Sequence, residues 1–168
     1  MAAKASSQRR RGTGDGISLP GEVRDQVVGE LLPRLYDALH LYTQLKHAHW
    51  NVTGPNFFGL HALFDDVAAQ SLEWSDLLAE RVRQLGRAAP GDLRAAASGS
   101  TLPSYPEDAS TWEAHVAAVA GALGQFATNI RAAIDRTDEA GDKGTADICT
   151  EISLAVDKAL WFVRSHAP

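Results

Sequence analysis

The sequence predicts an all-α protein that folds as a bundle of four long helices, and three observations support this. Apolar residues recur every three or four positions along four long segments, as in amphipathic helices, and strand-like alternation is scarce. Glycine and proline mark breaks between segments. A long connection, residues 87–109, separates the second and third segments, and its length favours a crossover between the ends of the bundle over a tight hairpin.

The first helix is expected from about Glu22 to Asn51. Ser18 is the expected capping residue, and Pro20 suits the first turn. Pro33 lies inside this segment, where proline removes a backbone hydrogen bond and usually kinks a helix. We therefore expect a bend or a late helix start at Pro33.

The second helix is expected from about Phe57 to Leu85, because the apolar pattern begins after Gly54 and Pro55 and ends at Gly86. The connection that follows is rich in glycine, proline, serine and alanine, and its residues 92–97 favour a short helix.

The third helix begins with a capping box formed by Ser110 and Glu113 and continues toward Gly141. The fourth is expected from about Thr145 to Ser165. The sequence contains no internal repeat, so we expect a single helical domain.

The composition indicates one globular domain, residues 17–168, preceded by a flexible basic arm, residues 1–16. A chain of 168 residues buries about 70% of its unfolded surface. No apolar run approaches the roughly 18 residues of a membrane span, and no apolar core follows the N-terminal basic residues. These features favour a cytoplasmic protein. The single cysteine, Cys149, precludes an intramolecular disulfide and is expected to be buried.

Five potential metal ligands occur between His49 and Glu80, and their spacing does not close one site within a single subunit. His61 and Asp65 form one pair four residues apart, and Asp76 and Glu80 form another, so each pair projects from one face of a helix. The pairs lie on nearly the same stripe but about 16 Å apart along the axis. Because metal–ligand bonds are roughly 2.0–2.6 Å long, no single ion joins the two pairs.

A second copy of the same helix resolves this geometry. An antiparallel, two-fold-related helix centred near Gln70 and Ser71 places each pair of one chain opposite the other pair of its partner, which gives two equivalent sites per dimer. Ala68, Ala69 and Leu72 lie on the same stripe and would allow a partner helix to approach closely. The sequence therefore predicts a metal centre shared between two subunits.

Other interpretations of single residues stay open. Glu80 taken alone is an ordinary surface carboxylate that pairs with Arg81 or Arg83, and His61 taken alone is a core histidine. As a set, two imidazoles with carboxylates and room for water suit a redox-active first-row metal such as iron, because calcium sites are nearly all oxygen. Structural zinc favours thiolates, and Cys149 is the only thiol.

Several motifs carry a resemblance to a known family. The segment HWNVTGPNFFGLHALFD (residues 49–65), continued by DLLAER (76–81), TADI (145–148) and DKALW (157–161), resembles the Dps miniferritins, the DNA-binding proteins from starved cells. The resemblance runs from about residue 20 to the C-terminus. It implies a ferritin-like four-helix bundle with a long crossover between the second and third helices. It further implies a hollow dodecamer whose interfacial ferroxidase sites oxidise ferrous iron, preferably with hydrogen peroxide, and store ferric mineral.

Each residue of the site has an expected role. His61, Asp65 and Glu80 are the expected direct ligands of iron. Asp76 is either a ligand or a hydrogen-bonding neighbour, and His49 holds either a second, weaker iron or a water. Few ligands per iron leave open positions at which peroxide coordinates.

Trp50 follows His49 directly and is interpreted in two ways. It either donates an electron when iron supplies only one, or serves as a packing residue.

Two rival functions also remain: a nucleoid-compacting, DNA-binding shell with little ferroxidase activity, and a shell that buffers toxic metal without oxidation.

Iron needs a route into such a shell. Residues 17–168 carry 12 Lys and Arg against 20 Asp and Glu, and acidic pores attract ferrous ions. The resemblance suggests three-fold pores near Asp142, Asp147 and Glu151, with Asp147 the best match. Lys143 and Gly144 occupy places that are often acidic in relatives, and carboxylates at a helix start are also favoured by the helix dipole alone.

The N-terminal arm carries Lys4, Arg9, Arg10 and Arg11 against Asp15, with little to bury. It is expected to be a basic tail that contacts phosphates of DNA without sequence preference, and twelve copies on one shell would add by multivalency. Against DNA binding, the rest of the chain is acidic. A solubilising tail without a partner is the alternative.

Overall fold

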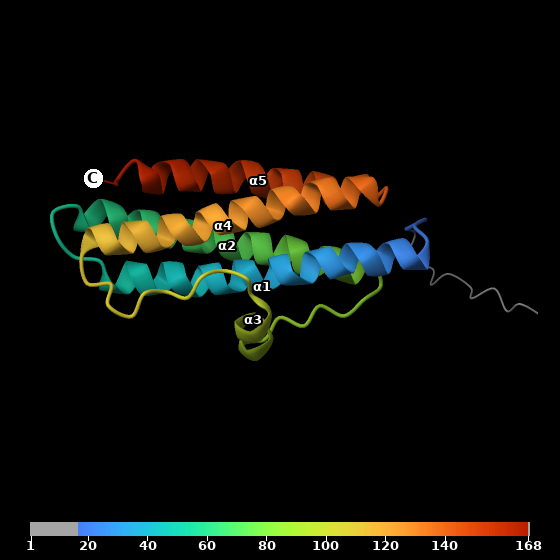
Figure 1. Cartoon of the computed structure of the whole chain (residues 1–168), viewed down its shortest axis with the longest axis horizontal. Coiled ribbons are helices and arrows are strands. Elements are labelled where there is room, and N and C mark those ends of the chain that lie inside the picture. The colour runs from blue at the N-terminus through green and yellow to red at the C-terminus, as the bar shows by residue number, and fades with distance from the viewer. Residues whose placement is uncertain (1–16, 168) are drawn as a thin grey trace, which may run out of the picture.

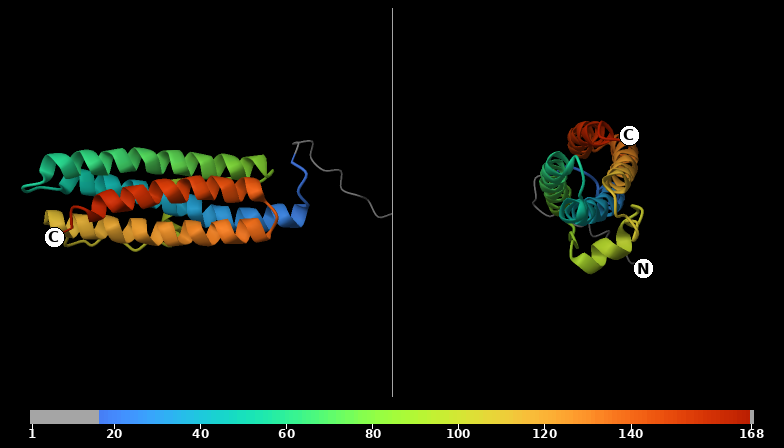
Figure 2. Two further views of the ribbon diagram at one scale, coloured as in Figure 1. Left: turned by 90° about the horizontal axis from the view of Figure 1, so that it is seen from above. Right: turned by 90° about the vertical axis from the view of Figure 1, so that its left-hand side faces the viewer.

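The structure, a computed structural model, describes residues 17–167. In that range it contains helices joined by turns and loops, and no strand. Four long helices lie side by side along the long axis of the molecule, and one short helix lies outside them (Figures 1 and 2). The elements are α1 (Gly21–Asn51), α2 (Phe57–Gln84), α3 (Leu93–Gly99), α4 (Trp112–Glu139) and α5 (Lys143–Arg164). The expected four-helix bundle is confirmed, and α3 is the short helix expected in the connection.

Two hairpins make up the bundle, because α1 packs most closely against α2 and α4 against α5. The connection from α2 to α4 runs the length of the bundle and carries α3 across the outside of α1 (Figure 1). Seen end-on, the four long helices lie around one axis (Figure 2), and their buried residues form one hydrophobic core. The largest fully buried side chains of this core include Phe64, Phe126, Leu31, Leu45 and Ile130.

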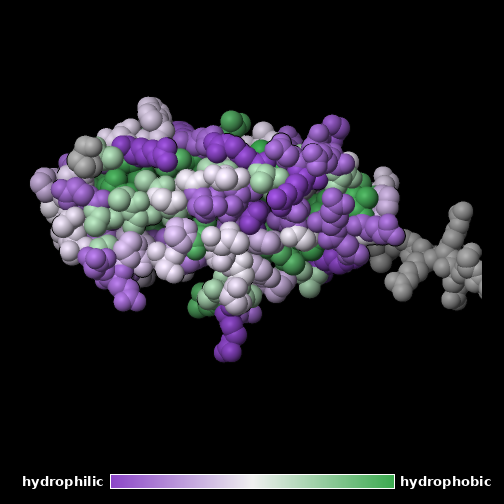
Figure 3. Space-filling model, viewed as in Figure 1, coloured by the Kyte–Doolittle hydropathy of each residue, from purple (hydrophilic) through white to green (hydrophobic). Residues whose placement is uncertain are grey.

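Hydrophilic residues cover much of the surface, and apolar residues are exposed in smaller patches (Figure 3). Cys149 is fully buried, as expected, and burial raises the pKa of its thiol to about 11. A thiol of that pKa is almost wholly protonated at neutral pH and is therefore a poor nucleophile. Within the described range, none of the helices has the length and apolar character needed to span a membrane.

The start of α1 differs from the expectation. Pro20, not Ser18, precedes the first helical residue, and no side chain caps the helix. The helix also runs without a break through Pro33, so the late start is wrong. Leu31 and Leu35, on either side of the proline, are 0% and 2% exposed, and this packing keeps the helix continuous although one backbone hydrogen bond is lost.

The starts of α4 and α5 are also set by residues other than those expected. Thr111, not Ser110, caps α4, because its hydroxyl accepts a hydrogen bond from the backbone N–H of Ala114 at 3.2 Å. Asp142 caps α5 by accepting from the backbone N–H of Thr145 at 3.1 Å, so the helix begins two residues before the expected start. Serine, threonine and aspartate side chains all accept hydrogen bonds from the first backbone N–H groups of a helix. Neighbouring residues of these types therefore suit the capping position about equally, and the sequence alone does not distinguish them.

A buried carboxylate ties the crossover to the bundle. Asp37 of α1 is fully buried and accepts a hydrogen bond from Arg34 Nε at 3.1 Å. It also accepts from the backbone N–H of Thr101 at 2.6 Å, from the Ser100 hydroxyl at 3.1 Å and from Asn129 Nδ2 of α4 at 2.9 Å. One side chain thus joins α1, α4 and the crossover, and its charge is balanced by Arg34.

Replacement of Asp37 by alanine is expected to destabilise the fold by about 3–5 kcal/mol, because it leaves a buried arginine without its counter-ion. Thermal or urea unfolding followed by circular dichroism measures this. Asp108→Ala, at an exposed position on the same crossover, is the matched control. Equal stability of the two variants would show that the Asp37 network contributes nothing.

Candidate metal centre

The two expected histidine ligands come together where α1 passes into α2. The connection between these helices is short and turns at Gly54, whose φ of 99° is a conformation that other residues rarely adopt. A Cβ atom at Gly54 would lie 3.1 Å from the Trp112 ring, so the turn is also closely packed. This turn places His49, in the last turn of α1, against His61, in the second turn of α2.

The imidazole rings of His49 and His61 stack, with centroids 3.7 Å apart and planes inclined by 21°. Their hydrogen bonds are reciprocal. Nδ1 of His49 donates to the backbone carbonyl of His61 at 2.7 Å, and Nδ1 of His61 donates to the carbonyl of His49 at 2.8 Å. A carbonyl only accepts, so both Nδ1 atoms carry a proton and, in the neutral rings, both Nε2 atoms keep a lone pair. Histidines that ligate metals are usually held in this way.

Asp65 supplies a carboxylate beside the two rings. Lys46 Nζ lies 2.5 Å from Asp65 Oδ1, and this hydrogen bond is the main reason that the pKa of the carboxyl is lowered, with a smaller contribution from the charge of Lys46. The Asp65 side chain is about half exposed. The carboxylate is therefore ionised and accessible, and it is held by an ion pair with Lys46.

Asp76 and Glu80 lie further along α2 and are both exposed. Glu80 pairs with neither of the two arginines considered as its partners. Arg81 binds Asp142, and Arg83 donates to a backbone carbonyl. Within residues 17–167, no three histidine, cysteine or acidic side chains come close enough together to hold a metal ion. Because α2 is continuous from Phe57 to Gln84, the two ligand pairs stay about 16 Å apart on one chain.

Of the three α2 residues that were expected to let a partner helix approach between the two ligand pairs, two are exposed. Ala69 is exposed and Leu72 is 42% exposed, so both are available to a partner. Ala68 is buried in the core of its own subunit, and Ser71 is buried with its hydroxyl bonded to the Ala38 carbonyl at 2.8 Å. These two residues border the core face of α2, so a partner helix would contact the other side of the stripe.

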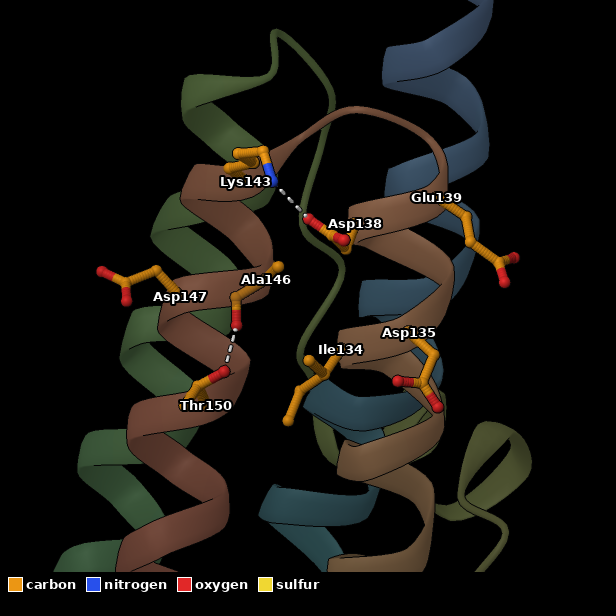
Figure 4. Close-up of a pocket in the computed structure, with 8 residues that line it drawn as sticks. All are labelled: Ile134, Asp135, Asp138, Glu139, Lys143, Ala146, Asp147 and Thr150. Carbon is orange, nitrogen blue, oxygen red and sulfur yellow. Dashed lines mark hydrogen bonds and ion pairs between the residues drawn. The ribbon is translucent and has the colours of Figure 1, made fainter.

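A hollow of about 500 Å³ lies between the end of α4 and the start of α5, where the iron-entry pore is expected (Figure 4). Asp147 lines it and is exposed, whereas the exposed Glu151 lies one turn further along α5. Lys143 forms an ion pair with Asp138 at 3.1 Å. Asp135 also lines the hollow, and sequence reasoning missed it, although its position three residues before Asp138 on the same helix is a recognisable signal.

Asp142 does not face this hollow. It is 3% exposed, and Arg81 Nη2 contacts its two oxygens at 2.7 and 3.0 Å. The Thr145 hydroxyl donates to Asp142 as well, at 2.6 Å. The structure therefore gives Asp142 a different position from the expected pore residue: it is a buried helix cap and ion-pair partner that joins the end of α2 to the start of α5.

Comparison with known proteins agrees with this fold. Residues 30–167 match the ferritin-like domain. A DNA protection during starvation protein of Agrobacterium fabrum is 42% identical over 148 residues, which cover 88% of this chain and 91% of that protein. The chain belongs to the Dps family of miniferritins. Among solved Dps structures, that of Mycobacterium smegmatis covers 89% of this chain and 91% of its own with 29% identity and a TM-score of 0.85. The structure of DpsC from Streptomyces coelicolor covers 89% of this chain and 88% of its own, with 32% identity and a TM-score of 0.85.

The four basic residues expected to contact DNA, Lys4, Arg9, Arg10 and Arg11, lie outside the described residues. DNA binding by the arm of this Dps-family chain stays a prediction.

Lys46→Met is expected to strengthen binding of a redox-inert divalent ion such as Co²⁺ at the His61 and Asp65 pair about two- to fivefold, since it removes the cation that competes for Asp65. Calorimetric titration of the assembled protein at neutral pH measures this. Lys158→Met, which removes an exposed cation from another helix, is the matched control. Weaker binding by the Lys46 variant would indicate that the lysine orients Asp65 for the metal and does not compete with it.

Proposed function

We propose that this protein is a ferroxidase miniferritin, which oxidises ferrous iron with hydrogen peroxide and stores the ferric product inside a hollow dodecameric shell. The observation that carries the proposal is the histidine pair. His49 and His61 each donate Nδ1–H to a carbonyl, so that each Nε2 lone pair is available to iron beside the ionised Asp65. The name of the relatives, DNA protection during starvation protein, supports a protective role.

The site is completed by a second subunit in this proposal. In an antiparallel two-fold pair, His49, His61 and Asp65 of one subunit face Asp76 and Glu80 of the other, and each dimer contains two equivalent sites. The chain matches the ferritin-like domain, and the ligand pairs of α2 lie on one stripe, with the three carboxylates exposed and His61 partly buried. A continuous α2 supports the pairing because it holds the two ligand pairs at a constant spacing.

Iron is the substrate of the reaction. Imidazole nitrogens and carboxylate oxygens bind ferrous ions, and the anionic oxygens stabilise the ferric product more strongly. One peroxide molecule takes one electron from each of two ferrous ions and yields two hydroxide ions. When both electrons come from iron, no hydroxyl radical is released, which agrees with a role in protecting DNA.

Trp50 is interpreted either as an electron donor when only one ferrous ion is present or as a packing residue. Its ring is 70% exposed, and the Lys46 ammonium lies 5.8 Å from the ring centroid. A cation over the ring stabilises its electrons and opposes oxidation. The role of Trp50 as electron donor therefore stays a prediction, with packing against Lys46 as its alternative.

A complementation experiment tests the shared site. The experiment uses two double variants, His61→Ala with Asp65→Ala and Asp76→Ala with Glu80→Ala. Neither is expected to show rapid ferrous oxidation, and both should assemble as the wild type does. When the two double variants are unfolded, mixed in equal amounts and refolded, about a quarter of the wild-type sites should return, because half of the random dimers regain one of their two sites.

Ferric absorbance and peroxide consumption after addition of ferrous iron are the measurements. Either variant refolded alone is the control. Mixing without recovery would contradict a shared site, and unchanged oxidation in the single preparations would contradict the ligand assignment. Iron binding without peroxide consumption in the wild type would favour the metal-buffering shell. The absence of both iron binding and peroxide consumption would favour a nucleoid-compacting protein.

Iron entry is proposed to pass the hollow lined by Asp147, with Glu151 on the next turn of α5. Asp147→Asn is expected to slow iron uptake roughly twofold at low iron and low salt, because one carboxylate of an attracting acidic surface is lost. The difference should shrink as salt rises. The rate of ferric absorbance at limiting iron measures this, with Asp108→Asn on the crossover as the control. Equal rates for the two variants would mean that iron enters elsewhere.

A further inference from the structure

A tyrosine and a histidine form a short hydrogen bond outside the metal centre. The hydroxyl of Tyr105, on the crossover, lies 2.6 Å from Nδ1 of His115, near the start of α4. His115 is 1% exposed, and Tyr105 is partly buried. Neither side chain belongs to the ligand set on α1 and α2, and neither is needed to explain iron binding.

The direction of this hydrogen bond follows from the surroundings. Burial raises the pKa of Tyr105 to about 12, so the phenol keeps its proton at neutral pH. Burial, with a smaller effect of the His47 charge, lowers the pKa of His115, so its imidazole is neutral. We therefore assign the phenol as the donor and Nδ1 of His115 as the acceptor, which leaves the proton of the neutral ring on Nε2. A backbone hydrogen bond to Asn51 acts on the same ring and raises its pKa, against the larger effect of burial. A proton acceptor therefore already contacts the phenol.

We infer that Tyr105 is a redox-active tyrosine that gives up one electron to an oxidant while its proton moves to Nδ1 of His115. A phenol that loses an electron becomes a strong acid, so oxidation of a buried tyrosine is favoured where a base already accepts its hydrogen bond. Of the three tyrosines, Tyr105 is the one for which the described structure shows a hydroxyl bonded to an imidazole. This inference rests on the proposed ferroxidase function for the source of its oxidant.

The pair lies across one helix from the proposed iron site. The His47 ring packs against Tyr105 with centroids 4.5 Å apart. His47 and His49 are two residues apart on α1, so they point to different sides of the helix. His49 faces the metal ligands and His47 faces the tyrosine, which separates the two centres by about the 10 Å width of a helix.

The chemical step balances when a site holds a single ferrous ion. Peroxide takes one electron from that ion and one from Tyr105, and its O–O bond breaks to give two hydroxide ions. The iron becomes ferric, the Tyr105 O–H bond breaks, and the proton joins His115, leaving a neutral tyrosyl radical and an imidazolium. A later ferrous ion returns the electron and becomes ferric, and His115 returns the proton. Tyr105 thus replaces the missing second iron, and no hydroxyl radical is released.

The test is freeze-quench electron paramagnetic resonance of the assembled protein with one ferrous ion per site and excess peroxide, with ferric absorbance recorded on the same samples. Wild type should show a tyrosyl signal that Tyr105→Phe loses. Tyr36→Phe and Tyr42→Phe, the matched controls, should keep it, as should Trp50→Phe. Spin-trapped hydroxyl radical should rise in Tyr105→Phe while the rate of ferric formation with two ferrous ions per site stays unchanged.

Two substitutions of His115 test the proton acceptor separately from folding. The wild-type radical should couple to an exchangeable proton, detected by electron–nuclear double resonance in ordinary and deuterated water. His115→Leu, which has no exchangeable side-chain proton, should lose this coupling, whereas His115→Gln, whose amide N–H can donate to the tyrosyl oxygen, is the comparison for folding. A merely structural role of His115 would leave the coupling in place. Circular dichroism and gel filtration verify that the variants are folded and assembled.

A second oxidant separates this inference from the proposed function. Photogenerated ruthenium(III) tris-bipyridine removes single electrons without iron, and it should produce the same Tyr105 radical. If ferric iron does not form, the proposed function fails, and the ruthenium experiment still decides the role of Tyr105. The inference is overturned if ferric iron forms without a tyrosyl signal, if Tyr105→Phe keeps the signal, or if Trp50→Phe alone abolishes it.

Discussion

The burial of α1 and α2 against each other is the contact on which both the core and the proposed metal centre depend. Leu45 and Ala48 of α1 and Leu60 and Phe64 of α2 are all fully buried close to the turn at Gly54. Burying one large aliphatic or aromatic side chain stabilises a fold by about 1.5–3 kcal/mol, so this end of the bundle is rigid. Under the proposed function this order matters chemically, because ligands that are already oriented lose less conformational entropy on binding iron.

Reciprocal hydrogen bonds make the two helix ends into one unit. The carbonyl of His49 lies in the last turn of α1, where helix carbonyls lack partners within the helix, and Nδ1–H of His61 supplies one. The same bond sets the tautomer of the ring. The contact that terminates α1 is therefore also the contact that orients the His61 ring.

Buried charges fix the parts of the molecule that apolar packing leaves undetermined. Asp37 with Arg34 holds the crossover on α1 and α4, and Asp142 with Arg81 joins the end of α2 to the start of α5. Buried ion pairs add little net stability over apolar contacts but penalise any arrangement that separates the charges. In this bundle they specify the path of the crossover, and that path brings Tyr105 to His115.

The sequence by itself determined the helical class, the number of long helices, the crossover and the positions of the candidate metal ligands on α1 and α2. These follow from spacing along one chain, because helical periodicity relates residues three and four apart directly to faces of a helix. Residues such as His61 and Asp65 could therefore be placed without coordinates. Caps such as Thr111 were misplaced by one residue, since several neighbours satisfy the same local chemistry.

Only the tertiary structure decided which polar residues meet across helices. Asp142 resembled a pore carboxylate in the sequence, but Arg81, far away along the chain, occupies its two oxygens. Lys46 on Asp65 and Tyr105 on His115 are likewise contacts between separate elements. Such contacts depend on the rotation and offset of one helix against another, which the packing of the whole core sets and which no local pattern in the chain encodes.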